Sequence, residues 1–423
     1  HWMVHSFPTR RSSDLVMILS DDQGYGDLGC YGAKDLRTPV TDRLAEQGVR
    51  FTQYYAAAPE CSPTRTALLT GRYLQRVGGL ECAIGVGNVG RYDDAIRLAG
   101  RHDLGLPSDL ATLPRALKAA GYATAVYGKW HLGYEEKFRP SRCGFDQFVG
   151  VLGGNADYFH HCENDGLHVL YENDKPLHRE GTYLTDLIAD QAAGFLKRQK
   201  GDRPFFLYVP FTAPHSPYQG PGDGKPQRLG EQEWEKGTRA KYVEMVEHLD
   251  ACVGRILAAL ETTGQAENTL VIFASDNGGN KMGSNVPFAG HKSGLYEGGI
   301  RVPCIARWPG VLPAGRTSSQ PSITMDLTAS MLAAAGATAP PELPLEGMDV
   351  LGHVRSGAAD RARTLFWRAR RGQRTWRAVR DGNLKYLTRQ DGDKIEQRLF
   401  DLSADPAEKT DLLAARPADA RSE

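Results

Sequence analysis

The sequence predicts an α/β protein in which helices cover both faces of one large, mostly parallel β-sheet. Short apolar runs recur along the 423 residues, and each is followed at once by polar residues. Segments with helical periodicity lie between these runs. Strands that alternate with helices form parallel sheets that are buried on both faces. We therefore expect a mixed, mostly parallel sheet between two helical layers.

Apolar runs of four to six residues are the strands that we expect in this sheet. They are Val16–Leu19, Tyr122–Tyr127, Phe205–Val209 and Leu270–Phe273. In open α/β sheets, ligands bind outside the carboxyl ends of the strands. The polar residues that follow the four runs are therefore expected to meet in one site.

Two helices have clear sequence signals. The segment from Pro39 to Gln47 has Thr38 as a candidate cap, proline in its first turn and Gly48 as a stop. A longer helix is predicted between residues 242 and 260, where apolar side chains recur at helical spacing.

The pattern changes near the end of the chain, from about Val311. Proline- and glycine-rich connections lead to strand-like segments on either side of Asp381-Gly382-Asn383, which is typical of a hairpin. We expect a main domain over residues 16–340 and a small α+β subdomain with an antiparallel sheet over residues 341–423.

Residues 1–15 are set apart from both domains. The stretch from His5 to Leu15 resembles a translated sequencing adapter, so we interpret residues 1–15 as a sequencing artefact. We expect that the natural start of the chain, with a secretion signal, is missing. The first residues therefore leave the location of the protein unknown.

The overall composition excludes several classes of partner. Lys and Arg together number 51, as do Asp and Glu, so no net charge draws the protein to nucleic acid or to an anionic membrane. No apolar run approaches the roughly 20 residues that span a bilayer. We expect neither a nucleic-acid partner nor a membrane span.

The seven cysteines show no spacing typical of zinc or redox sites. Most of them are expected to be small buried side chains. Because their number is odd, at least one stays unpaired in any disulfide scheme, and Cys61 is our candidate for it.

Two pairs of oxygen-bearing side chains indicate a divalent metal. Asp21 and Asp22 follow the first expected strand, and Asp276 and Asn277 follow the last. Carboxylate and amide oxygens suit Ca²⁺ or Mg²⁺ and would not select zinc. Each pair alone is also typical of a turn. Two such pairs at strand ends, one of them with adjacent aspartates that repel each other, favour a metal site.

Cys61 is expected at the N-terminus of a helix, in a place that attracts anions. Ser62 is suited to cap this helix, and Pro63 to its first turn. The amides and dipole at that end favour negative charge, and Arg65 adds a charged fork one turn later. An ordinary nucleophilic cysteine also fits such a place, so the local sequence leaves the chemistry of Cys61 open.

The same segment resembles the formylglycine signature of type I sulfatases. In that signature the cysteine of a Cys-x-Pro-x-Arg core is oxidised to an aldehyde, and residues 69–72 match its second half. The resemblance covers almost the whole chain. It continues through segments 21–27, 128–133, 213–215, 275–278, 292–303 and 399–406. It implies an alkaline-phosphatase-like α/β/α sandwich, with residues 16–340 as the catalytic domain.

The resemblance also implies the cofactors and the reaction, which is that of a sulfatase, a sulfuric ester hydrolase. One Ca²⁺, or Mg²⁺, would be held by Asp21, Asp22, Cys61, Asp276 and Asn277. A formylglycine-generating enzyme would convert Cys61 to 3-oxoalanine, and the hydrated aldehyde would attack the sulfur of a sulfate ester while Asp276 helps to accept its proton.

The same resemblance also implies catalytic roles for five basic residues. Arg65 and Lys129 would balance charge on the sulfuryl oxygens. His215 and Lys292 would protonate the leaving group, and His131 would take the proton of the remaining hydroxyl.

The substrate is less closely defined than the reaction. The motif spacing is similar to that of arylsulfatases and N-acetylgalactosamine-6-sulfatases, which implies sulfated small molecules or glycans and a periplasmic or secreted location. Asn155 falls where that family has a further sulfate-contacting side chain, and loops 77–106 and 152–179 are expected to wall the pocket. Kinship at the level of the fold does not name the sugar.

Two other functions stay open. A phosphonate monoester or phosphodiester hydrolase of the same superfamily would use the same aldehyde and metal. A non-catalytic binder of sulfated glycans would keep the fold without the reaction, although every expected catalytic position is filled.

Overall fold

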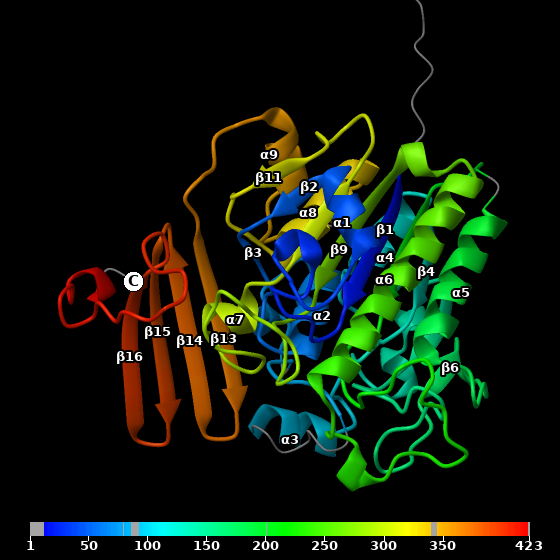
Figure 1. Cartoon of the computed structure of the whole chain (residues 1–423), viewed down its shortest axis with the longest axis horizontal. Helices are drawn as coiled ribbons and strands as arrows, with labels where there is room; N and C mark the ends of the chain where they lie inside the picture. The colour runs from blue at the N-terminus through cyan, green and yellow to red at the C-terminus, as the bar shows by residue number, and fades with distance from the viewer. Residues whose placement is uncertain (1–11, 79, 86–92, 200, 340–344, 422–423) are drawn as a thin grey trace, which may run out of the picture.

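One large sheet forms the centre of the computed structural model, which describes residues 12–78, 80–85, 93–199, 201–339 and 345–421. In order across the sheet, its strands are β11 (Arg316–Ser318), β2 (Val49–Phe51), β10 (Cys304–Arg307), β9 (Thr269–Ser275), β1 (Asp14–Ser20), β8 (Phe205–Pro210), β4 (Ala123–Tyr127), β5 (Gln147–Val151), β6 (Leu170–Glu172) and β7 (Lys175–Pro176). The neighbours β9, β1, β8, β4 and β5 run parallel, whereas β10, β6 and β7 are antiparallel to their neighbours (Figure 1). The predicted mostly parallel sheet is confirmed.

Helices cover both faces of this sheet. One layer contains α2 (Cys61–Thr70), α4 (Leu113–Ala119), α8 (Thr324–Ala335) and α9 (Val350–Ser356), with α3 (Asp93–Gly100) at its margin, and the other contains α1 (Pro39–Glu46), α5 (Leu184–Arg198) and α6 (Arg239–Thr262). Alternate residues of a strand point to opposite faces. Accordingly, Leu15, Met17 and Leu19 of β1 are buried with the first layer, and Val16 and Ile18 with the second.

All four predicted strands are present in the structure as β1, β4, β8 and β9. β1 begins at Asp14, so it includes two residues of the segment 1–15 that we interpret as adapter sequence. Both of these residues are buried and pair with β9. Residues 1–11 lie outside the described part of the chain.

The two predicted helix caps differ from the structure. Thr38 precedes α1 but makes no capping bond. Its Oγ1 instead accepts a hydrogen bond from the N–H of Gly29 at 2.8 Å and donates to Oδ1 of Asp42 at 3.2 Å. Ser62 is inside α2, which begins one residue earlier, at Cys61. Its Oγ accepts a hydrogen bond from the backbone N–H of Ile84 at 2.9 Å, so the hydroxyl holds a neighbouring loop and does not cap the helix.

An antiparallel sheet lies beside the main domain, as predicted for the end of the chain (Figure 1). Its strands are β13 (Thr364–Arg371), β14 (Arg374–Asp381), β15 (Leu384–Asp391) and β16 (Lys394–Asp401). α9 precedes this sheet but packs into the main core through Val350, Leu351 and Val354. The antiparallel sheet itself begins at Thr364, with β13.

Polar contacts and a small two-stranded sheet lie between the main domain and the C-terminal antiparallel sheet. Strands β3 (Tyr54–Tyr55) and β12 (Ser322–Ile323) pair there. The hydroxyl of Tyr55 donates to Oε2 of Glu297, the first residue of α7 (Glu297–Ile300), at 2.6 Å. It also accepts a hydrogen bond from Arg380 of β14 at 2.6 Å. The C-terminal sheet is thus bonded to the main domain through buried groups.

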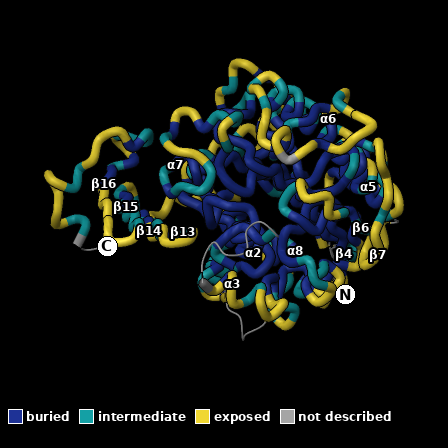
Figure 2. Tube along the Cα trace, turned by 90° about the horizontal axis from the view of Figure 1, so that it is seen from below, coloured by how far each residue is buried: buried dark blue, intermediate teal, exposed yellow. Residues whose placement is uncertain are grey.

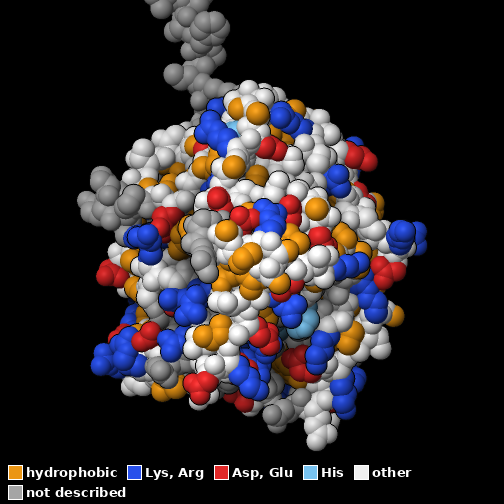
Figure 3. Space-filling model, turned by 90° about the vertical axis from the view of Figure 1, so that its left-hand side faces the viewer, with side chains coloured by type: hydrophobic (Ala, Val, Ile, Leu, Met, Phe, Trp, Pro, Cys, Tyr) orange, Lys and Arg blue, Asp and Glu red, His pale blue; other side chains and the backbone are white. Residues whose placement is uncertain are grey.

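The large sheet is buried throughout, whereas the C-terminal strands are more exposed (Figure 2). On the side of the molecule that carries the C-terminal sheet, basic and acidic side chains are interspersed (Figure 3). All seven cysteines lie in the described part of the chain, and none forms a disulfide. Among the described helices, none is both long and apolar enough to cross a bilayer.

Candidate active site

Polar side chains from neighbouring parallel strands meet at the carboxyl edge of the large sheet. This is the edge at which α/β proteins bind ligands. The residues brought together after β1, β4, β8 and β9 are Asp21, Asp22, Lys129, His215, Asp276 and Asn277.

Asp22 lies at the centre of this group. Its φ of 61° is in the left-handed region, which is uncommon for residues other than glycine. Its N–H donates to Oδ1 of Asp276 at 3.2 Å, and its own Oδ1 accepts a hydrogen bond from Nδ2 of Asn277 at 2.7 Å. This turn brings the two predicted pairs of oxygen-bearing side chains into contact.

The side chains of this centre suit a bound divalent cation. Ligand atoms of Asp21, Asp22, Cys61 and His215 lie within 4.8 Å of one another. Oδ1 of Asn277 is buried and has no hydrogen-bond partner among the described residues. Carboxylate and amide oxygens are the ligands that Ca²⁺ and Mg²⁺ take. His215, which was predicted as an acid only, also comes within reach of a metal.

Arg65 and Lys129 are buried beneath these carboxylates. Nη2 of Arg65 donates to Oδ2 of Asp276 at 2.9 Å and lies 3.6 Å from Oδ2 of Asp21. Nζ of Lys129 donates to the same oxygen of Asp21. Both cations therefore bind the carboxylates of this group. Their role of balancing charge on the sulfuryl oxygens of a substrate stays a prediction.

Cys61 is the first residue of α2 and lies against the same group, with 1% of its surface exposed. Its Sγ is 3.4 Å from Oδ1 of Asp21 and 3.4 Å from Nζ of Lys292. Burial, and then the negative charge of Asp21, raise the pKa of the thiol. These surroundings favour the neutral thiol and argue against an ordinary thiolate nucleophile.

Lys292 and His215 both contact Asp22. Nζ of Lys292 lies 2.7 Å from Oδ1 of Asp22, and Nε2 of His215 lies 3.6 Å from its Oδ2. Burial alone would raise the pKa of Asp22, but the charges of Lys292 and His215 outweigh it and hold the pKa at about 2. Burial, and then the charge of Lys292, lower the pKa of His215 to about 4.

A cavity of about 520 Å³ adjoins these side chains. The predicted residues that line it are Cys61, His131, Asn155, His215 and Lys292, and the expected wall loops contribute Ala83, Ile84, Gly85, Gly154, Glu163 and Asn164. Nine further lining residues were not predicted from the sequence, namely Glu60, Tyr134, Ser216, Trp234, Glu235, Asn280, His291, Ser293 and Arg371. The position of Glu60 next to Cys61 was an available signal, whereas nothing near Arg371 in the sequence indicates its place.

His131 lines this cavity with a left-handed φ of 56°. Its Nε2 is hydrogen-bonded to the carbonyl oxygen of Ile84, and its Nδ1 is buried without a partner in the part of the chain that the structure describes. Burial, and then the charges of Lys129 and Arg65, lower the pKa of His131 well below its ordinary value. The imidazole is therefore neutral at pH 7. Because a carbonyl oxygen only accepts, Nε2 carries the ring hydrogen and Nδ1 keeps a free lone pair.

The fold and the site together are those of an α/β protein with a candidate divalent-metal site at the carboxyl edge of its sheet. The sulfatase family model matches residues 13–337, and the chain belongs to the sulfatase family. The predicted alkaline-phosphatase-like sandwich is confirmed by the same family and by its solved members.

Individual relatives agree with this family. N-acetylgalactosamine-6-sulfatase of Canis lupus familiaris is 36% identical over 355 residues, covering 80% of this chain and 65% of that protein. This chain therefore spans 65% of the length of that relative. The crystal structure of Ps i-CgsB has a TM-score of 0.85 at 29% identity, covering 97% of this chain and 91% of that one, and it is also known in complex with k-i-k-neocarrahexaose. Phosphonate monoester hydrolase of Agrobacterium radiobacter shares the fold, with a TM-score of 0.68 at 20% identity over 97% of this chain and 94% of that one.

Proposed function

We propose that the protein hydrolyses sulfate monoesters of sulfated carbohydrates in the cavity that contains Cys61. The observation that carries this proposal is the position of Cys61 Sγ, which lies 3.4 Å from a carboxylate oxygen of Asp21 and 3.4 Å from Nζ of Lys292. A nucleophile derived from this side chain would stand where the N-terminus of α2 and Lys292 both attract an anion.

The charge balance of the site supports an anionic substrate. Three carboxylates and three cations form the described group, namely Asp21, Asp22, Asp276, Arg65, Lys129 and Lys292. A divalent cation would add net positive charge to this otherwise balanced group. The charge would act in a buried place, where electrostatic attraction is stronger than in water.

Two further groups would complete the site. A Ca²⁺ or Mg²⁺ ion, held by Asp21, Asp22, Asp276 and Asn277 together with the modified Cys61, would act as a Lewis acid. Oxidation of Cys61 to formylglycine would supply, as the hydrate of the aldehyde, a hydroxyl nucleophile in place of the thiol.

The chain's own side chains supply the proton transfers. An alkoxide is a poor leaving group, so it needs a proton from a positioned acid. His215 and Lys292 line the cavity, and a bound anionic ester would raise the pKa of His215 and favour its proton-bearing form. The neutral His131, with its unpartnered Nδ1, is suited to the base that takes the remaining proton of the hydrate.

The relatives support a sulfated glycan as the substrate class. One is named N-acetylgalactosamine-6-sulfatase, and another was crystallised with k-i-k-neocarrahexaose. From membership of the sulfatase family we also propose a periplasmic or secreted location, and a formylglycine-generating enzyme as the partner that matures Cys61.

The experiment is co-expression with a formylglycine-generating enzyme, followed by the mass of the Cys61 peptide and turnover of nitrophenyl sulfate. We expect the mass of the aldehyde, and hydrolysis that is lost in Cys61→Ala but kept in Cys143→Ala, a buried cysteine outside the site. Undiminished turnover by a protein with an unmodified thiol would contradict the mechanism. Faster turnover of a nitrophenyl phosphonate monoester would assign the site to phosphonates, and binding of sulfated sugars without turnover would make it a lectin-like site.

A further inference from the structure

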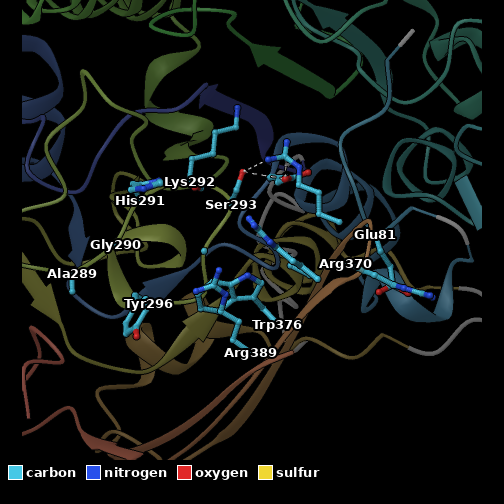
Figure 4. Close-up of a pocket in the computed structure, with 15 residues that line it drawn as sticks. Glu81, Ala289, Gly290, His291, Lys292, Ser293, Tyr296, Arg370, Trp376 and Arg389 are labelled. Carbon is cyan, nitrogen blue, oxygen red and sulfur yellow. Dashed lines mark hydrogen bonds and ion pairs between the residues drawn. The ribbon is translucent and has the colours of Figure 1, made fainter. Parts of the chain in front are cut away.

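A second cavity lies beside the one that contains Cys61, between the loop 289–296 and the C-terminal sheet (Figure 4). Its volume is about 580 Å³. Pockets that hold small ligands range over roughly 300–1,000 Å³. Figure 4 shows Lys292 and Ser293 on one side of this cavity and Trp376 with Arg389 on the other.

The two cavities adjoin each other. The residues that line both are Glu60, His291, Lys292, Ser293 and Arg371. Lys292 contacts Asp22 and Cys61 from this shared boundary. A chain-like ligand with one group at Cys61 would therefore extend past Lys292 into the second cavity.

Basic side chains dominate the second cavity. Among the described lining residues, five are basic and two are acidic, namely Lys292, Arg370, Arg371, Arg374 and Arg389 against Glu60 and Glu81. The chain as a whole has equal numbers of basic and acidic residues, so this excess is local. A cleft lined mainly by one sign of charge concentrates ligands of the opposite sign.

The register of the C-terminal sheet places Arg374 and Arg389 on the face that lines the cavity. Trp376 of β14 pairs directly with Arg389 of β15, so the two side chains lie on the same face of the sheet. Arg374 lies two residues before Trp376 and therefore shares this face. Arg377, the residue after Trp376, projects to the opposite face and does not line the cavity.

The guanidinium of Arg389 lies over an aromatic ring and has no carboxylate oxygen among the described residues within 3.5 Å. Its guanidinium carbon lies 5.1 Å from the centroid of Trp376. Its nearest carboxylate oxygens, on Asp391 and Glu396, are 3.9 and 3.7 Å away. Exposed pairs at such distances contribute little, so the planar guanidinium stays able to bind another anion. Arg374 is paired more closely, at 2.7 Å from Asp391.

We propose that the second cavity binds a further acidic group, a sulfate or a carboxylate, of the same sugar chain whose sulfate ester reaches Cys61. This proposal rests on the proposed function of the first cavity and narrows its substrate class. The substrate is then an oligosaccharide or polysaccharide with at least two acidic groups, and not a singly sulfated monosaccharide.

The test compares the matured wild type with an Arg374→Ala/Arg389→Ala double variant and with Arg377→Ala as the matched control. The substrates are nitrophenyl sulfate and sulfated tetrasaccharides prepared from carrageenan and from chondroitin sulfate. The readout is kcat/KM for a tetrasaccharide divided by kcat/KM for nitrophenyl sulfate. We expect this ratio to fall about tenfold in the double variant, mainly through KM, because two charge-assisted contacts are lost. It should not change in Arg377→Ala.

Two outcomes would overturn the inference. One is an unchanged ratio in the double variant. The other is an equal loss on all substrates, because the cavity would then act only through the position of Lys292. If the wild type hydrolyses no sulfate ester, the proposed function fails instead. Calorimetric titration with the same tetrasaccharides then tests whether the second cavity binds an acidic group. Weaker binding by the double variant than by the wild type would support the inference, and equal binding would contradict it.

Discussion

Nζ of Lys385 lies 2.9 Å from Oε1 of Glu297, in an ion pair that is wholly buried between the C-terminal sheet and the main domain. Glu408 binds the same ammonium group at 2.9 Å and accepts a hydrogen bond from the N–H of Glu297 at 2.5 Å. Glu297 directly follows the loop 289–296, which lines both cavities. These contacts therefore fix that loop to the C-terminal sheet.

Replacement of Lys385 by methionine should destabilise the protein strongly. The change leaves Glu408 without the ammonium group that it binds and leaves Glu297 with Arg301 as its ion-pair partner, at 3.2 Å. Breaking a buried pair by removing one partner costs about 3–5 kcal/mol. The measurement is the midpoint of urea unfolding. Lys394→Met, an exposed lysine at the start of β16, is the control and should shift the midpoint little. Equal shifts in the two variants would show that the buried pair does not hold the subdomain.

Glu408 should make stability depend on pH. Burial is the largest influence on this carboxyl and, against the opposing charge of Lys385, raises its pKa from 4.5 to about 7. A raised pKa favours folding while the group is protonated, so this contribution is present below pH 4.5 and is lost as the pH rises through 7. The free energy of unfolding of the wild type, relative to Glu408→Gln, should therefore fall between pH 5 and pH 8. A difference that stays constant across this range would contradict the assignment.

Calcium should stabilise the chelator-treated protein. Binding to the folded state alone adds about 2.7 kcal/mol at 100 times Kd. Asp22→Asn should weaken this effect, because it removes a carboxylate from the centre of the candidate metal site. Asp186→Asn is the control, since Asp186, His248 and Cys252 form another described group with metal-ligand spacing. If the rise in Tm on addition of Ca²⁺ depends on Asp186 and not on Asp22, the metal site is wrongly placed.

His215→Gln should reduce the hydrolysis of alkyl sulfates more than that of nitrophenyl sulfate. A positioned acid contributes about 10²–10⁴-fold to rate, and a nitrophenolate leaves without its help. The measurement is kcat/KM for both esters, and the exposed His178→Gln variant is the control. Equal losses on the two esters would indicate that His215 acts in another way, for example through the metal.

Features that follow from the local sequence, such as where a strand ends, could be predicted. Pairings between residues far apart in the sequence could not. The direction of a strand alone places Asp21 and Asp276 at the same sheet edge, so their meeting followed from the strand assignment. The burial of Arg65 against Asp276 was not predicted, because the sequence does not tell which of several partners a cation binds. The pairing of Glu297 with Lys385 was also missed, since the two residues are 88 positions apart and no local pattern links them. The contribution of Arg371 to the cavity at Cys61 was missed because Arg371 is also far from Cys61 in the sequence.

The order of the strands in the large sheet also determines how long Cys61 stays accessible while the chain is being synthesised. β1 pairs with β8 and β9, so that Leu15 lies beside Phe206 and Leu270. At about 5–20 residues per second, a ribosome needs roughly 10–40 s to make the chain between Cys61 and the end of β9. Until β9 is made, the sheet edge that buries Cys61 is incomplete. Any enzyme that oxidises Cys61 during translation has this interval in which to reach it, and the strand order sets its length.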